Sequence, residues 1–282
     1  MSGRRFLSFA ILAIAWLSLP SVARGQQRPL LTEDPETVSA GLILVEGGLD
    51  LQESIFYPVS GLEGDLLRVP VLGMSIGIGP MAEVQVDGGF YNRLSINSRT
   101  PAPLSNQLDI DDDDTTDVED LVVATKVRLL PEGPGHPALG IRLATRLPLA
   151  DNESGLGTDT LEFNVSALVG KTVRSIRMVG NLGMSILGDP TRGDEQGDLM
   201  TYGFSLARAV KQGIELVGEI NGRYAPNEDT PGLESRAAMR FGGRITTGTV
   251  RLDAGAIIGL TSRDPSIGFT AGLTWVFRAF TP

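Results

Sequence analysis

Apolar and polar residues alternate along most of the chain, in segments of roughly ten residues with turn-forming residues between them. In the segment 83–94, Val84 and Val86 share one side of an extended strand, whereas Glu83 and Asp87 share the other. Strands with one apolar side and one polar or small side are typical of transmembrane β-barrels, in which the apolar side contacts lipid and the other lines a lumen.

Glycine recurs inside these segments, where each would cost about 1 kcal/mol in a helix. We therefore predict strands, and an all-β fold: a transmembrane antiparallel β-barrel of about twelve strands of the outer-membrane type. A count of ten or fourteen stays open if a segment has been merged or split. The predicted strands are 38–54, 65–78, 83–94, 120–130, 138–149, 160–170, 176–187, 199–210, 214–224, 233–245, 249–260 and 267–280.

The connections alternate between long and short, as the outer loops and periplasmic turns of outer-membrane barrels do. Both ends of the barrel domain are then periplasmic, which requires an even strand count. The long connections are 55–64, 95–119, 150–159, 188–198, 225–232 and 261–266, and the short ones are 79–82, 131–137, 171–175, 211–213 and 246–248.

The last segment is rich in aromatic residues, including Trp275, Phe277 and Phe280. Such residues suit the aromatic girdle at a membrane interface. They also look like the signal by which barrel-insertion machinery recognises its substrates, although Thr281 and Pro282 follow where a terminal aromatic is usual.

The first 25 residues have the organisation of a cleaved export signal. Arg4 and Arg5 precede an apolar run, and Ala23-Arg24-Gly25 forms a small-x-small cleavage site. The apolar run is too short for a retained membrane helix, which needs about 20 residues. We predict a signal peptide at 1–25, a single barrel domain at 26–282, and the bacterial outer membrane, with its lipid and lipopolysaccharide, as the location.

A soluble β-sandwich is the main structural alternative, because its strands also alternate. Sandwich strands usually have about 5 to 6 residues, whereas the predicted segments are longer. The alternation of short and long connections also favours the barrel.

Composition restricts the chemistry that the chain can perform. Cysteine is absent, histidine occurs once, and the pI is about 4.7, which argues against thiol chemistry and a nucleic-acid partner. A lipid-cleaving barrel would need a Ser–His pair near the outer leaflet, but His136 lies in a predicted periplasmic turn. We predict no enzyme, no catalytic residue, no metal ligand and no cofactor.

Charged residues occupy many of the predicted lumen positions. We expect the acids of the third strand to face the bases of the fourth and fifth, and the arginines to favour anions weakly. Two interpretations remain open: a polar pore that selects solutes, and an interior filled by its own salt bridges. The predicted lumen-lining residues are Asp87, Lys126, Arg128, Arg142, Arg146, Arg240 and Arg251.

The connection 95–119 is strongly acidic. A solvated outer loop that holds divalent ions near lipid headgroups is one interpretation, since carboxylates are hard oxygen ligands. A loop that folds inward as a constriction is the other. The candidate gate or ion-contact residues are Asp111, Asp112, Asp113 and Asp114.

Several short motifs occur along the mature part of the chain: Leu31-Thr32-Glu33-Asp34-Pro35-Glu36-Thr37, Gly41, Glu46-Gly47, Glu119-Asp120-Leu121, Lys126, Arg128-Leu129-Leu130, Leu147-Pro148, Gly155-Leu156-Gly157-Thr158-Asp159 and Gly180-Asn181-Leu182-Gly183. With these motifs the chain resembles the outer-membrane family named for the MetA pathway of phenol degradation. One departure is Pro148-Leu149-Ala150, where Pro-Thr-Gly is usual.

The resemblance implies a barrel that takes part in transport, in some cases of hydrophobic or aromatic compounds; it assigns neither phenol nor any ligand residue to this chain. The sequence therefore predicts a passive channel or transporter for small solutes, with aromatic or anionic compounds as candidates. The alternative is a structural or surface-binding barrel with a plugged lumen.

Overall fold

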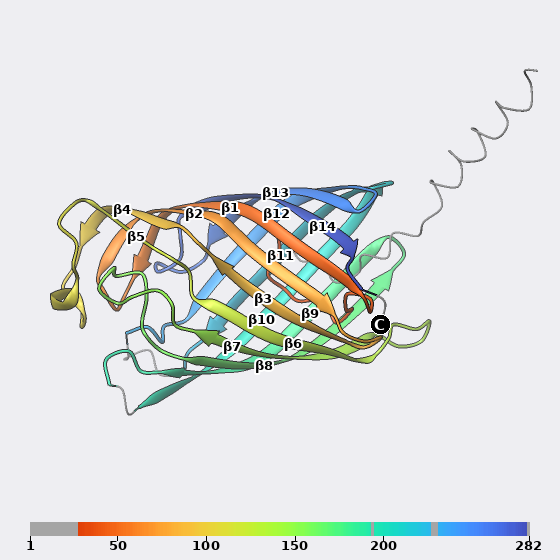
Figure 1. Cartoon of the computed structure of the whole chain (residues 1–282), viewed down its shortest axis with the longest axis horizontal. Helices are drawn as coiled ribbons and strands as arrows, with labels where there is room; N and C mark the ends of the chain where they lie inside the picture. The colour runs from red at the N-terminus through yellow and green to blue at the C-terminus, as the bar shows by residue number, and fades with distance from the viewer. Residues whose placement is uncertain (1–27, 193–194, 227–230, 281–282) are drawn as a thin grey trace, which may run out of the picture.

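Antiparallel strands pair in a continuous ring in the computed structural model, which describes residues 28–192, 195–226 and 231–280 (Figure 1). The predicted signal peptide lies outside the described residues. The strands are β1 (Leu42–Tyr57), β2 (Leu62–Gly77), β3 (Ala82–Gly89), β4 (Asn92–Arg99), β5 (Asp114–Asp117), β6 (Leu121–Leu130), β7 (Ala138–Leu147), β8 (Glu162–Val173), β9 (Ile176–Gly188), β10 (Gln196–Lys211), β11 (Ile214–Tyr224), β12 (Arg236–Thr247), β13 (Val250–Gly259) and β14 (Ile267–Arg278).

Within the described residues, fourteen strands fill twelve positions of the barrel. β3 and β4 both pair with β2 and continue one another, while β6 pairs with β3 and β5 with β4. β1 pairs with both β2 and β14 and so closes the ring. The predicted twelve-stranded antiparallel barrel is therefore confirmed.

The interruption between β3 and β4 has a local cause in β2. Pro70 lies opposite Phe90 and Tyr91, between the pairs Arg68↔Asn92 and Val71↔Gly89. Proline has no backbone N–H to donate, and the regular pairing stops opposite it, where the Val69 N–H still donates to the Tyr91 carbonyl at 2.8 Å. The predicted segment 83–94 is consequently two pieces of a longer strand that reaches Arg99.

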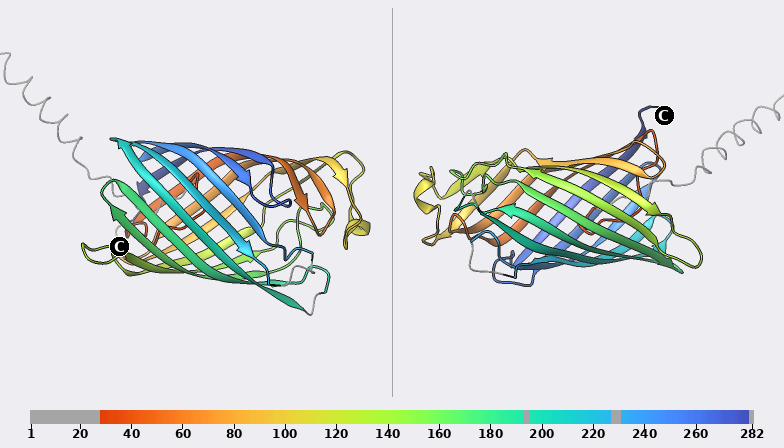
Figure 2. Two further views of the ribbon diagram at one scale, coloured as in Figure 1. Left: turned by 180° about the vertical axis from the view of Figure 1, so that it is seen from behind. Right: turned by 90° about the horizontal axis from the view of Figure 1, so that it is seen from below.

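The two ends of the barrel differ, as expected from the connection lengths. The short turns and the C-terminus share one end, and the longer loops share the other (Figures 1 and 2). The connection 55–64 is shorter than predicted, because β1 and β2 extend and leave only residues 58–61 between them. Likewise 95–119 shrinks to 100–113, with η1 (Ser105–Gln107) in it.

The alternation separates a lipid-facing side from a lumen-facing side. On β8, Phe163, Val165 and Val169 are exposed, whereas Leu168 between them is buried. On β3, Glu83 and Gln85 are almost completely buried inside the barrel. Within the described residues, no helix is long and apolar enough to cross a membrane.

Candidate functional site

Residues 28–41, here called the lumenal segment, cross the interior of the barrel before β1 begins. Arg28 contacts β14, Glu33 contacts β9, and Val38 donates its N–H to Glu83 on β3. The predicted first strand, 38–54, is therefore wrong at its start: residues 38–41 are the end of the lumenal segment, and β1 runs from Leu42 to Tyr57.

The centre of the segment is fixed by a buried ionic cluster. Glu33 lies 3.1 Å from Lys126 on β6 and 3.1 Å from Arg142 on β7, and Lys126 lies 3.0 Å from Glu83. The side chains of Lys126 and Glu83 are 0 % exposed. A buried charge is tolerable only when it is paired and hydrogen-bonded, so this cluster specifies where the segment passes.

Wall side chains also satisfy the backbone of the segment. The Glu219 carboxylate accepts the N–H groups of Leu31 and Thr32, both at 2.8 Å. The Asn181 amide accepts the N–H of Glu33 at 2.7 Å and donates to its carbonyl at 2.8 Å. Because buried backbone groups need partners, these side chains replace the ladder that a strand would have given the segment.

A second set of ion pairs fixes the segment near the short-turn end. Asp34 lies 2.6 Å from Arg177, which also contacts Glu132 in the turn 131–137 at 2.7 Å. Partial burial acts to raise the pKa of Glu132, but hydrogen bonds from Thr172 and the neighbouring cations outweigh it and lower that pKa. Glu36 pairs with Arg128 in the same region.

Small residues in the wall make room for the segment. A Cβ atom on Gly203 would lie 2.8 Å from Thr32 Oγ1, and one on Gly170 would lie 2.9 Å from Pro35 Cγ. Both distances are too short for ordinary contact. Glycine in a strand often marks a close approach of backbone, and here it does so at the lumenal segment.

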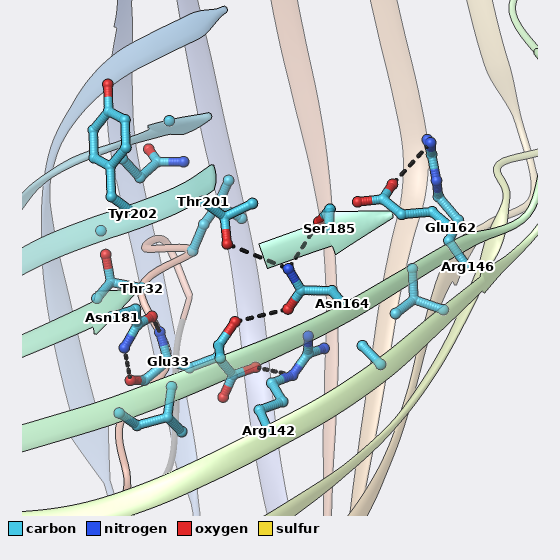
Figure 3. A pocket seen from close by; sticks show the side chains of 18 residues that line it. Thr32, Glu33, Arg142, Arg146, Glu162, Asn164, Asn181, Ser185, Thr201 and Tyr202 are labelled. Carbon is cyan, nitrogen blue, oxygen red and sulfur yellow. Dashed lines mark hydrogen bonds and ion pairs between the residues drawn. The ribbon is translucent and has the colours of Figure 1, made fainter. Parts of the chain in front are cut away.

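Above the segment, toward the longer loops, lies a cavity of about 310 Å³ (Figure 3). Leu31, Thr32 and Glu33 form its floor, and β6 to β11 form its wall. A second space of about 260 Å³ lies among the outer loops, and Arg146 lines both. Arg146 therefore stands where the outer space meets the inner cavity.

The structure places the predicted lumen residues inside the barrel but in different environments. Arg142 and Arg146 line the cavity, and Lys126 is buried beneath it. Asp87 lies 3.7 Å from Arg142, and Glu83 lies 3.0 Å from Lys126. For these two pairs, acids of the predicted third strand do face bases of the predicted fourth and fifth strands. Three others make ion pairs away from the cavity: Arg128 with Glu36, Arg240 with Glu219, and Arg251 with Glu215.

The acidic connection stays outside the lumen. Leu108 and Ile110 pack against the apolar cluster of Leu62, Leu66 and Leu94 at the outer end, and the N–H of Asp109 donates to the Glu153 carbonyl of the neighbouring loop. Asp111, Asp112 and Asp113 are exposed and Asp114 begins β5. The loop does not fold inward as a constriction.

A family profile described as "Putative MetA-pathway of phenol degradation" matches residues 27–277. The chain belongs to this family. The resemblance carried by the short motifs is therefore confirmed, and the match begins just before the lumenal segment. No curated protein sequence matches the chain.

A solved outer membrane channel has the same fold as this family member. The COG4313 outer membrane channel from Pseudomonas putida F1 superposes with a TM-score of 0.63 at 14% identity, covering 86% of this chain and 98% of that one. The translocator domain of the autotransporter NalP from Neisseria meningitidis has a TM-score of 0.49 at 12% identity, covering 85% and 89%. Family membership and the similarity to the Pseudomonas putida channel together identify the chain as an outer-membrane β-barrel.

The sequence does not predict two groups of residues at this candidate site. The acids of the lumenal segment, Glu33, Asp34 and Glu36, stand out in the sequence only as part of a family motif. Asn164 and Thr201 line the cavity but are uncharged, so a search for charged residues at lumen-facing positions does not find them. The one sequence feature that points to a segment other than a strand is the polar, proline-containing stretch between the predicted signal peptide and the first regular alternation.

Proposed function

We propose that this barrel is a gated passive channel for small polar solutes, and that the lumenal segment is its gate. The observation that carries the proposal is the kind of contact that holds the segment: ion pairs and hydrogen bonds to the lumen wall, beside a cavity that opens toward the outer loops. Water and a polar solute can take the place of ion pairs and hydrogen bonds. They cannot take the place of the contacts in an apolar core, because its dense packing excludes both.

The similarity to a protein described as an outer membrane channel supports the same proposal. Anion selection has less support from the wall, because Arg142, Arg146 and Arg240 each have an acidic partner. We therefore propose weak ion selectivity, and we assign no aromatic substrate from the family description.

The proposal involves no covalent step. The histidine, His136, lies in the turn 131–137, where its Nδ1 lies 3.2 Å from the Pro137 carbonyl, at the end away from the outer loops. The proposal includes insertion by the barrel-insertion machinery through β14, whose Trp275 and Phe269 face outward, and contact of the outer loops with lipopolysaccharide.

A disulfide lock tests the gate directly, because the natural chain has no cysteine. An ideal Cβ on Gly203 lies 3.5 Å from the Thr32 Cβ, within the range that disulfides use, about 3.5–4.5 Å. We expect Thr32→Cys/Gly203→Cys to be silent in a planar bilayer when oxidised and to conduct when reduced. The two single-cysteine variants should conduct regardless of reductant.

Equal conductance of the double-cysteine variant in the oxidised and reduced states would show that the lumenal segment is not the gate. Silence in both states and in the wild type, with folding verified by heat-dependent gel mobility, would support the second candidate function, a structural or surface-binding barrel whose lumen stays plugged.

A further inference from the structure

Uncharged hydrogen-bonding side chains are the most numerous group among the residues that line the cavity above the lumenal segment, beside apolar and charged residues (Figure 3). Asn164 on β8 donates to Ser185 at 2.8 Å and to Thr201 at 3.3 Å, and it accepts from Ser166 at 2.7 Å. Asn221 on β11 and Thr32 on the floor line the same space. Amides and hydroxyls both donate and accept, so this wall complements a ligand with groups of both kinds.

Part of this polar wall has no partner among the described residues. Thr32 Oγ1, Asn221 Oδ1 and Arg146 Nε are all buried without a hydrogen bond, and Thr32 is only 5% exposed. A buried polar atom left unpaired costs about 1–3 kcal/mol. Groups from opposite sides of the cavity, β7 and β11, therefore need partners that the protein itself does not provide.

The charges at the cavity compensate one another. Arg146 lies 2.9 Å from Glu162 and 3.5 Å from Asp120, while Arg142 pairs with Glu33 and donates to Gln85. A charged solute would meet guanidinium and carboxylate groups that are already paired. An aromatic hydrocarbon would leave the amides and hydroxyls without water or partners, which disfavours it further.

We propose that this cavity binds one small, uncharged, polyhydroxylated solute of the size of a monosaccharide or polyol. The hydroxyls of such a solute can donate to Asn221 Oδ1 and can both donate to and accept from the Thr32 hydroxyl, the buried groups that lack a partner among the described residues. The volume, about 310 Å³, lies at the small end of ligand pockets, roughly 300–1,000 Å³. This inference rests on the proposed channel, because it names the solute class that the channel admits.

Binding is tested without passage, by saturation-transfer NMR titrations of the wild-type barrel in detergent. The probes are D-glucose and mannitol as polyols, gluconate as the anion and phenol as the aromatic compound. We expect saturable signals from glucose and mannitol that compete with each other, and none from phenol or gluconate in the same concentration range. Because no solute needs to cross the barrel, a failure here leaves the disulfide-lock result standing, and the reverse also holds.

Two matched variants connect the signal to the cavity. Thr201→Val removes a cavity hydroxyl with little change in shape, whereas Thr145→Val removes one from the lipid-facing groove that contains Leu143 and Phe163. We expect Thr201→Val to weaken glucose binding about fivefold, as the loss of one neutral hydrogen bond implies, and Thr145→Val to leave it unchanged. Absence of glucose binding, equal effects of the two variants, or tighter binding of gluconate or phenol would overturn the proposal.

Discussion

The lumenal segment and the loop 100–113 are both acidic and largely without regular structure, yet one lies inside the barrel and the other outside. The acids of the segment, Glu33, Asp34 and Glu36, each contact a base of the wall. The loop instead carries successive aspartates, of which Asp111, Asp112 and Asp113 are exposed. Complementary partners on the wall, more than acidity or length, decide which segment occupies the lumen.

The largest effect should come from breaking the buried cluster at its centre. Lys126→Met leaves Glu33 and Glu83 facing each other without their shared cation. Removing one partner of a buried pair typically destabilises by about 3–5 kcal/mol. We expect a lower unfolding temperature in heat-modifiability gels and more frequent openings in planar bilayers.

The matched control for that change is Arg93→Met. The Arg93–Asp114 pair is 2.8 Å long but about half exposed, with side-chain exposures of 48% and 38%, and such pairs contribute only about 0–1 kcal/mol. Equal losses for Lys126→Met and Arg93→Met would mean that the buried cluster does not hold the segment.

A smaller effect is expected from Glu132, which contacts Arg177 beside Asp34. Because the folded state lowers the pKa of Glu132, its contribution is present above the ordinary carboxyl pKa and is lost as the pH falls through the lowered value. Glu132 is accessible to solvent, so this contribution should stay below about 1 kcal/mol. We expect Glu132→Gln to reduce thermal stability slightly at neutral pH and to have no effect under strongly acidic conditions. The same loss at all pH values would contradict an ionic role.

The smallest effect should follow from neutralising the outer loop. Asp111→Asn/Asp112→Asn/Asp113→Asn changes exposed side chains, and surface substitutions of this kind usually alter stability by less than about 0.5 kcal/mol. We expect unchanged gating and at most a modest shift of ion preference toward anions at low salt, measured by reversal potential. A large rise in conductance would instead support the prediction that this loop is the gate.

The barrel itself could be predicted from the sequence because the alternation of apolar and polar residues in each strand depends only on its lipid-facing and lumen-facing sides. Val84 and Glu83 alternate regardless of what lies across the lumen, and the turn lengths give the orientation. Strand ends were harder to predict, since Pro70 affects β3 only through pairing. The position of the lumenal segment could not be predicted from the sequence, because it depends on partners such as Lys126 and Asn181, which are distant in the chain.

The lumenal segment also has a consequence for the order in which the barrel is assembled. It precedes every strand, yet Arg28 contacts Thr270, 242 residues later, and Asp34 contacts Arg177, 143 residues later. Contacts of such sequence separation form slowly, because the chain between them must be ordered first. The earliest part of the barrel domain to be synthesised is thus expected to find its partners late, as is β1, whose partner β14 is the last strand.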